Sequence, residues 1–417
     1  MNKQTTLPKN TTNNRPENIQ DLPPLSLYIH IPWCVQKCPY CDFNSHTLKH
    51  DIDELDYVEE LIKDLDTDIK SYALQNRPLH SIFIGGGTPS VFSAKAIEAL
   101  LSQVLQRFEH SADIEITLEA NPGTVEAEKF KGFAKAGVSR LSIGVQSFES
   151  EKLIKLGRIH GVEQAKVAAE LAKTSGVKSF NLDLMHGLPN QSLDNALEDL
   201  KTAISLSPDH ISWYQLTIEP NTAFHSRPPK LPQDEVLWDI QDKGFEILKA
   251  HGYVQYEISA FSKDKKQCQH NLNYWTFGDY IGIGCGAHGK LTSLDEHNNF
   301  IIKRTVKVKH PKGYLTKDRP HLDQCNLVTT NELPFEFMMN RLRLSSTFCL
   351  SEFKNRTGLS SELLLPGLNE AKQKGLLSIE TPKESLEQAT ETKAQEDLWT
   401  VTTLGHRYLN DLLEIFL

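Results

Sequence analysis

The sequence predicts an α/β fold, namely a partial (β/α)6 TIM-like barrel followed by a smaller, mainly helical α+β domain. Two observations carry this prediction. Six short β-type runs alternate with longer amphipathic stretches between residues 25 and 252, and the alternation stops beyond residue 252. Successive strand-then-helix units are typical of a parallel sheet with crossover helices. Because a closed barrel of this type has eight units, six units predict a barrel that stays open.

The predicted strands are rich in branched and aromatic residues, and the predicted helices carry apolar residues three or four positions apart. The strands cover residues 25–31, 81–86, 114–120, 140–145, 179–185 and 210–216. The helices include residues 54–73, 94–108, 127–137, 161–176 and 193–206.

Composition divides the chain into four predicted segments. The first is poor in apolar residues and rich in Asn, Thr and Pro, which is typical of a disordered tail. The third holds the run HNLNYW and a β-ribbon near residues 301–314, and the fourth has a helical pattern with a second ribbon formed by residues 376–380 and 398–402. The segments are a tail at 1–24, a barrel at 25–252, an irregular segment at 253–325 and a helical, winged domain at 326–417.

Charge and cysteine usage exclude several classes of protein. The 45 basic and 54 acidic residues leave a net charge of -9, which predicts no general affinity for nucleic acid. No apolar run approaches the roughly 20 residues of a membrane span, and the first residues lack the apolar core of a secretion signal. Seven cysteines, an odd number, do not indicate a disulfide framework. We therefore expect a cytoplasmic protein whose thiols stay reduced.

Three of the cysteines lie in one loop directly after the first strand. Cys34, Cys38 and Cys41 have the spacing C-x3-C-x2-C. Dense thiolates bind zinc or iron-sulfur clusters, but a structural zinc site usually takes four ligands from two pairs, and the chain has no second C-x2-C. The spacing therefore predicts an iron-sulfur cube with one iron open to an exogenous ligand; the alternative is three incidental thiols.

Further polar and glycine residues fall where predicted strands end. The run GGGTP at 85–89 follows the second strand, Glu119 closes the third, Gln146 follows the fourth and Asp183 lies near the end of the fifth. Functional side chains of such barrels gather at the C-terminal ends of the strands, so we expect a site there. The alternative is that each side chain makes an ordinary loop hydrogen bond.

These motifs carry a resemblance. The cysteine spacing, Tyr40 just before the third cysteine, and the GGGTP loop resemble radical S-adenosylmethionine proteins. Within that superfamily, YIHIPWC, FIGGGTPS, EANP, IGVQSF, LGRIH and NLDLMHGLP together resemble the oxygen-independent coproporphyrinogen III oxidases and their relatives, the HemW-type haem chaperones. The likeness covers roughly residues 25–290, which supports a partial barrel of the radical SAM type.

The resemblance implies the cofactors and their residues. Cys34, Cys38 and Cys41 would hold three irons of a [4Fe-4S] cluster, and the fourth iron would take the amino and carboxylate groups of S-adenosylmethionine. Glycines 86 and 87 would let the backbone approach the methionine moiety, which a Cβ would obstruct. The residues implied to bind S-adenosylmethionine are Tyr28, Tyr40, Gly86, Gly87, Thr88, Glu119, Gln146, Arg158 and Asp183.

Two features separate this chain from the oxidases. The oxidases resemble it up to the third cysteine but carry one more cysteine two positions later, where this chain has Phe43. HNLNYW at 270–275 fits the HNxxYW motif of HemW-type proteins, which implies that His270 is a haem ligand. The alternative for His270 is a packing or capping role.

The resemblance to HemW-type proteins implies a haem chaperone that carries a [4Fe-4S] cluster and S-adenosylmethionine, with haem as its cargo. Its expected partners are haem-accepting proteins, membrane-associated respiratory enzymes among them, and a cluster-dependent homodimer is a further expectation. We assign no catalytic residue and expect no oxidase activity. The alternatives are a coproporphyrinogen III oxidase, which Phe43 disfavours because a phenyl ring lacks thiol chemistry, and a radical enzyme acting on another substrate.

Overall fold

The computed structural model describes residues 22–123, 127–380 and 397–417. Most of the predicted N-terminal tail, residues 1–21, lies outside this range. No helix in the described part of the chain is long and apolar enough to cross a lipid bilayer.

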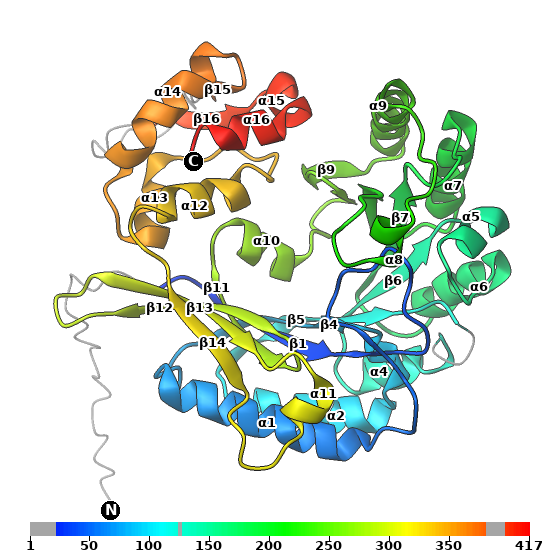
Figure 1. The fold of residues 1–417 in the computed structure, drawn as a ribbon, viewed down its shortest axis with the longest axis horizontal. Coiled ribbons are helices and arrows are strands. Elements are labelled where there is room, and N and C mark those ends of the chain that lie inside the picture. Colours follow the sequence, from blue (N-terminus) through cyan, green and yellow to red (C-terminus); the bar gives the residue numbers. More distant parts are fainter. Residues whose placement is uncertain (1–21, 124–126, 381–396) are drawn as a thin grey trace, which may run out of the picture.

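One large sheet organises the molecule, with the strand order β14-β13-β12-β11-β1-β4-β5-β6-β7-β8-β10-β9 (Figure 1). The six predicted barrel strands are neighbours in chain order and pair in parallel, which confirms the partial barrel. They are β1 (Leu25–Ile31), β4 (Leu79–Gly86), β5 (His110–Ala120), β6 (Arg140–Gln146), β7 (Ser179–His186) and β8 (His210–Gln215).

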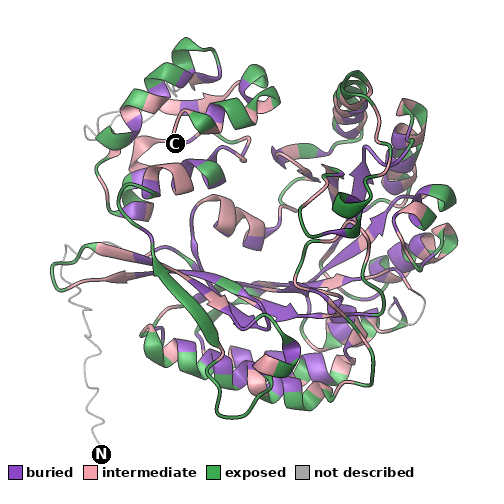
Figure 2. Ribbon diagram, viewed as in Figure 1, coloured by how far each residue is buried: buried purple, intermediate pink, exposed green. Residues whose placement is uncertain are grey.

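Helices follow these strands and cover the outer face of the sheet (Figure 1). The first begins after Asp53, whose side chain accepts a hydrogen bond from the Asp56 N–H and so caps the helix. Its buried face includes Tyr57 and Leu61, whereas its opposite face is exposed (Figure 2). The helices are α1 (Glu54–Ser71), η1 (Pro89–Val91), α2 (Ala94–Leu105), α4 (Phe130–Lys135), α5 (Ser150–Lys155), α6 (Val162–Lys173), α7 (Leu193–Ser205), α8 (Ala223–Ser226) and α9 (Asp234–Ala250).

The sheet continues beyond residue 252, where the sequence suggested an irregular segment. β9 (Val254–Glu257) and β10 (Ala260–Ser262) extend the edge next to β8 in antiparallel pairing. The chain then passes through α10 (Gln269–Trp275) to the other edge, where β11 (Asp279–Gly284) pairs in parallel with β1. Antiparallel strands β12 (His288–Leu294), β13 (Phe300–Lys307) and β14 (Leu322–Leu327), with the short α11 (Pro311–Tyr314), complete the sheet.

A buried ion-pair cluster joins β13 to α1. Lys307 Nζ lies 2.8 Å from Asp68 Oδ1 and also pairs with Asp64, and its side chain is almost fully buried. Tyr314 donates a hydrogen bond to Asp64 Oδ2 at 2.8 Å. The ribbon expected at 301–314 forms only as far as Lys307, because Pro311–Tyr314 are the helix α11, and Lys307 faces the interior and not solvent.

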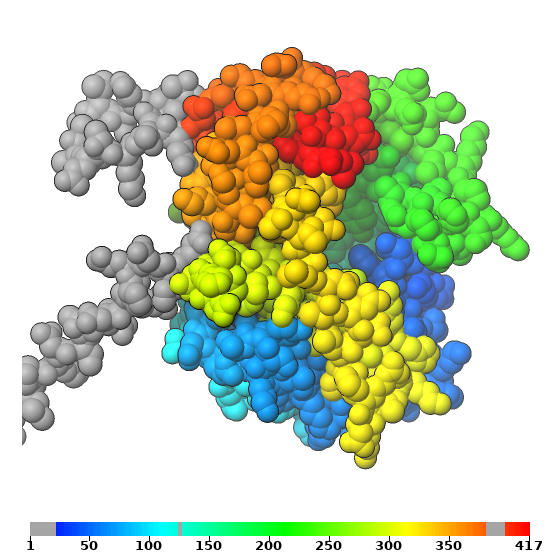
Figure 3. All heavy atoms as spheres, turned by 60° about the vertical axis from the view of Figure 1, so that its left-hand side comes forward, coloured from blue at the N-terminus to red at the C-terminus, as the bar shows by residue number. Residues whose placement is uncertain are grey.

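The C-terminal residues form their own apolar core around Phe337, Phe353 and Trp399, to which Phe277 and Ile302 from the sheet segment contribute. The predicted second ribbon forms between β15 (Leu377–Glu380) and β16 (Leu398–Val401). Figure 3 shows these C-terminal elements, in orange and red, stacked above the yellow-green segment that contains β12 and β13. The helices are α12 (Leu333–Arg341), α13 (Leu350–Thr357), η2 (Ser361–Leu364), α14 (Leu365–Gln373), α15 (Thr403–Arg407) and α16 (Leu409–Glu414).

Candidate cofactor and haem site

The structure brings most of the predicted site residues together at the C-terminal ends of the parallel strands. One cavity of about 340 Å³ is lined by Cys34, Cys38, Tyr40, Cys41, Gly86, Gly87, Thr88, Glu119, Gln146, Arg158 and Asp183. Tyr28 and His270 line an adjacent cavity of about 290 Å³ instead. The two cavities share Phe43, Gly86, Glu119, Asn271 and Trp275, so they are continuous along one wall.

The cysteine loop is held at both ends and across its middle. At its base β2 (Trp33–Cys34) pairs with β3 (His46–Thr47), and within the loop the Cys41 N–H donates to the Cys38 carbonyl at 3.2 Å. The Asn44 amide donates to the carbonyls of Cys285 and Lys309, at 2.9 Å each. These contacts tie the loop to the end of β11, more than two hundred residues away in the chain.

The three thiols have surroundings that fit a cluster. Burial raises the pKa values of the Cys34 and Cys41 thiols, which by itself disfavours the thiolate forms that bind iron. Arg158 Nη1 donates to Cys38 Sγ at 3.5 Å and places a positive charge beside a prospective thiolate. No three His, Cys, Asp or Glu side chains in the described ranges form a group that could hold a metal ion. All three thiols do line one cavity, and cysteine thiolates are the ligands of iron-sulfur clusters.

The glycine loop packs directly on the cysteine loop. Gly87 N–H donates to the Ile31 carbonyl and Thr88 N–H to the Trp33 carbonyl, both at 2.8 Å. A Cβ on Gly87 would lie 2.6 Å from the Trp33 carbonyl oxygen, and one on Gly86, whose φ is +116°, would lie 2.7 Å from the His30 ring. Contacts within the protein therefore already require glycine at positions 86 and 87. That these glycines also admit a methionine moiety stays a prediction.

Two buried carboxyl groups face the cavity. Burial and, second to it, the nearby Asp183 carboxylate raise the pKa of Glu119 to about 8, against the opposing effect of the Gly86 N–H, which donates to Glu119 Oε2 at 3.1 Å. Burial also raises the pKa of Asp183, although Ser142 and Asn181 donate hydrogen bonds to it at 3.0 and 2.7 Å. Such a pair fits a cationic ligand, because added positive charge relieves both desolvated carboxylates.

Arg158 links the thiol loop to the strand ends. Its Nη2 donates to the Gly144 carbonyl at 2.6 Å and to Asn121 Oδ1 at 2.8 Å, and the Asn121 amide in turn donates to the Thr88 hydroxyl at 3.2 Å. The buried Nε of Arg158 has no partner among the described residues. An unpaired buried donor at a cavity wall indicates that a polar ligand completes the site.

Gln146 and Tyr40 complete this wall. The Tyr214 hydroxyl donates a hydrogen bond to Gln146 Oε1 at 2.8 Å, which fixes the side-chain amide. The backbone of Gln146 is in the left-handed region, with a φ of +71°. Tyr40 packs against Phe224 with ring centroids 6.4 Å apart.

His270 is buried on α10, and only one of its two ring nitrogens has a hydrogen-bond partner among the described residues. Its Nδ1 lies 3.1 Å from the Ser81 hydroxyl, which lies 2.8 Å from the Ser26 hydroxyl, and the Asn273 amide donates to Ser26 at 2.9 Å. The buried Nε2 has no partner among the described residues. Burial lowers the pKa of His270 to about 3, so the ring is neutral near pH 7.

Several residues of the site were not predicted from sequence. Asn121 lies inside the EANP run, so its motif was a usable signal, and Tyr214 alternates with the buried Trp213 on β8. Arg343 reaches the cavity from the C-terminal part, with its guanidinium 4.2 Å from the Trp275 ring and 3.3 Å from Glu257. No local pattern marks Arg343, because only the packing of α12 and its following turn beside α10 brings it there.

Two family models match separate parts of the chain. The sequence model of the Radical SAM superfamily matches residues 28–203, and that of the HemN C-terminal domain matches residues 328–381. The solved structure of coproporphyrinogen III oxidase (HemN) from Escherichia coli aligns with a TM-score of 0.76 at 22% identity, covering 95% of this chain and 90% of that one. At this identity the likeness supports the fold.

Curated relatives named "Heme chaperone HemW" match over almost the whole chain. The Haemophilus influenzae protein is 55% identical over 95% of this chain and 98% of its own length. The Escherichia coli protein is 56% identical over 95% and 99%, and the Bacillus subtilis protein is 36% identical over 84% and 92%. Radical SAM proteins are built around a [4Fe-4S] cluster and S-adenosylmethionine, and the chain belongs to the HemW family of this superfamily.

Proposed function

We propose that the chain is a haem chaperone, which binds haem beside a [4Fe-4S] cluster with S-adenosylmethionine and delivers the haem to haem-requiring proteins such as respiratory enzymes. The name of the curated relatives supports this function. The observation in the structure that carries it is the buried, neutral His270, which lines an aromatic cavity next to the cysteine loop and whose Nε2 has no partner among the described residues.

The residues for the cofactors are those of the larger cavity. Cys34, Cys38 and Cys41 would hold the cluster, and Arg158 would place a positive charge beside the Cys38 sulfur. Glu119 and Asp183 would accept the cationic and hydroxyl groups of S-adenosylmethionine. A cluster with this cofactor supplies one-electron chemistry.

His270 would bind the haem iron through Nε2. An imidazole ligand must be neutral, and burial holds the pKa of His270 far below physiological pH. Hydrogen bonding at Nδ1 orients a ligating ring, which is the role the Ser81 hydroxyl would have.

The oxidase alternative receives no support from the site. Phe43 stands where a fourth cysteine would be, and its phenyl ring lines both cavities without any thiol chemistry to offer. A cytoplasmic location, respiratory acceptors and a cluster-dependent homodimer belong to the same proposal. The dimer is tested by gel filtration with and without the cluster, where one identical size would refute it.

Haem titration of the anaerobically reconstituted protein tests the proposal, with decarboxylation of coproporphyrinogen III measured on the same sample. We expect stoichiometric haem uptake, weakened in His270→Ala but not in His251→Ala, whose imidazole is exposed at the end of α9. Decarboxylation without specific haem uptake would overturn the chaperone and establish the oxidase.

A further inference from the structure

We infer that the haem is seated across two joined cavities bordered by Phe43, with its macrocycle against that phenyl ring and its two carboxylates against Lys37 and Lys309. This inference rests on the proposed function and names the residues that recognise the cargo. The structure offers three separate features for such a ligand: an aromatic wall, an unpaired imidazole nitrogen and a cationic rim.

The aromatic wall belongs to the cavity that His270 lines. Its volume is about 290 Å³, and its lining is dominated by rings from three parts of the chain: the first strands, the cysteine loop and α10. The rings are Tyr28, Phe43, Phe83, Tyr274 and Trp275. Flat aromatic faces suit a planar macrocycle, because stacked rings bury large apolar areas in a defined geometry.

Phe43 lies outside the apolar cores of the described part of the protein. Its side chain is 63% exposed and belongs to none of the apolar core clusters of the described residues. The ring borders three cavities at once, and this position, more than its exposure, is what offers it to a ligand.

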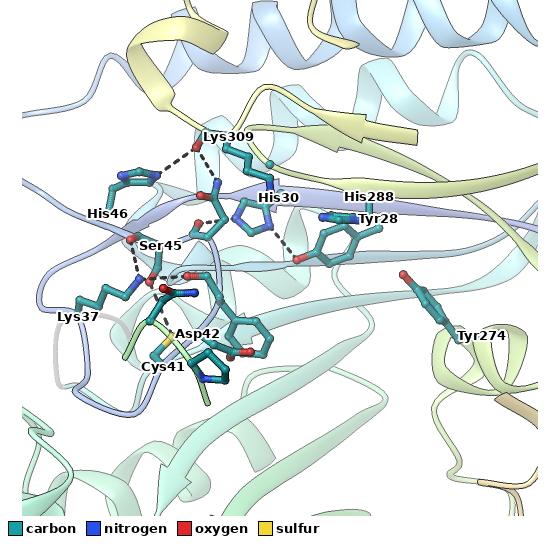
Figure 4. A pocket seen from close by; sticks show the side chains of 15 residues that line it. Tyr28, His30, Lys37, Cys41, Asp42, Ser45, His46, Tyr274, His288 and Lys309 are labelled. Atoms are coloured by element: carbon teal, nitrogen blue, oxygen red, sulfur yellow. Dashed lines mark hydrogen bonds between the residues drawn. The ribbon is translucent and has the colours of Figure 1, made fainter. Parts of the chain in front are cut away.

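The cationic rim belongs to a neighbouring cavity of about 610 Å³, which shares Tyr28, Phe43 and Tyr274 with the smaller one (Figure 4). Lys37 and Lys309 line it, and Asp42 is the acidic residue among its lining. Lys37 Nζ donates to the carbonyls of Phe43 and Ser45, at 3.2 and 3.4 Å, which keeps the ammonium at the rim of the loop.

Three histidines line the same cavity, but they are neutral, so the lysines are its cationic side chains. Burial lowers the pKa values of His30, His46 and His288, that of His30 to about 4. The nearby Lys37 lowers the pKa of His46, and Lys309 lowers that of His288. These imidazoles are therefore neutral at pH 7, and two ammonium groups against one carboxylate leave the rim able to hold anionic carboxylates.

Haem combines the three properties that this arrangement matches: a planar aromatic ring, an iron that takes an imidazole nitrogen, and two propionate carboxylates. A porphyrinogen without metal would leave the His270 nitrogen unpaired. Phe43 thus does more than remove a thiol from the site, since it supplies the ring on which the cargo rests.

The test compares haem with haem dimethyl ester, which keeps the ring and iron but lacks the charges, on anaerobically reconstituted full-length protein. We expect the wild type to bind haem more tightly than the ester. Lys309→Gln and the double variant Lys37→Gln/Lys309→Gln should lose about tenfold in haem affinity and nothing in ester affinity. Phe43→Ala should lose about tenfold for both ligands, and Phe43→Tyr should recover the loss.

Lys312→Gln is the matched control, because Lys312 is a lysine of the same region that lines a different cavity. Iron and sulfide content of each variant shows that the cysteine loop still holds its cluster. Haem uptake by the wild type that is unchanged in the Lys309, Lys37 and Phe43 variants overturns the inference and leaves the proposed function standing. A wild type that binds neither ligand overturns the proposed function itself.

Discussion

Replacing Gly87 by alanine tests whether the glycine loop needs its glycine for contact with the cysteine loop. The new Cβ would lie 2.6 Å from the Trp33 carbonyl oxygen and 2.8 Å from the Pro32 carbonyl carbon, both of them backbone atoms that cannot rotate away. Ordinary contact begins at 3.4 Å, so the two loops must separate by about 0.8 Å, and overpacking of this kind costs about 1–3 kcal/mol.

The separation also weakens two hydrogen bonds, Gly87 N–H to Ile31 and Thr88 N–H to Trp33, each of which contributes about 1 kcal/mol. We expect the midpoint of thermal unfolding to fall by roughly 5 °C. Because the displaced partner is the loop that carries Cys34, the iron content after reconstitution should fall as well.

The assay is thermal unfolding by circular dichroism, together with iron and sulfide analysis of reconstituted protein. Gly161→Ala is the control, since nothing lies within 4 Å of its added Cβ and its φ is -98°. The loss of glycine at that helix N-cap costs up to about 1 kcal/mol and leaves the cluster untouched. A Gly87→Ala protein with wild-type unfolding and wild-type iron content would refute the steric argument.

Three further predictions follow from buried groups. Burial gives Glu119 a folded pKa of about 8, above its unfolded value, so ionising it costs stability as pH rises from about 4 to 8, by at most about 5 kcal/mol. Urea unfolding of the cofactor-free chain should therefore weaken over this range and stay flatter in Glu119→Gln; parallel profiles would contradict the assignment. Lys307→Met leaves Asp64 and Asp68 buried without their cation and should cost about 3–5 kcal/mol, measured by the same unfolding, with partial recovery at lower pH as Asp68, whose pKa burial raises to about 6, protonates. Ser81→Ala removes the partner of His270 Nδ1 and should lower haem affinity by about 10–100-fold with a shifted Soret band. The control Ser102→Ala on α2 should match the wild type. An unshifted spectrum in Ser81→Ala would show that the Ser81 hydroxyl does not orient the His270 ring.

The barrel strands were predictable because each is a short run rich in branched and aromatic residues that is followed by a helical pattern. β11 escaped prediction because its glycines weaken any strand pattern. The structure explains them: a Cβ on Gly282 would lie 1.9 Å from the His288 carbonyl oxygen, and one on Gly284 would lie 2.3 Å from that of His30. The backbone of β11 approaches β12 and the end of β1 so closely that it needs glycine at these positions, and glycines in a sequence are typical of loops.

Part of the candidate site was also predictable from the sequence. Parallel strands end at one edge of a sheet, so the sequence could place the GGGTP loop, Glu119 and Gln146 near the cysteines. Outside the site, the sequence could not show that Lys307 is buried in an ion-pair cluster, because the partner carboxylates come from α1, over two hundred residues earlier.

By itself, the sequence determined the alternation of strands and helices, the three clustered thiols, the absence of a fourth at Phe43, and the motifs that identify the family. These are local properties, set by residue type and by spacing within one element. The tertiary structure alone decided that Asn44 ties the cysteine loop to β11, that Arg343 reaches the cavity, and that the cavities meet at Phe43. Such contacts depend on strand order and on the closure of long loops, which no short-range pattern encodes.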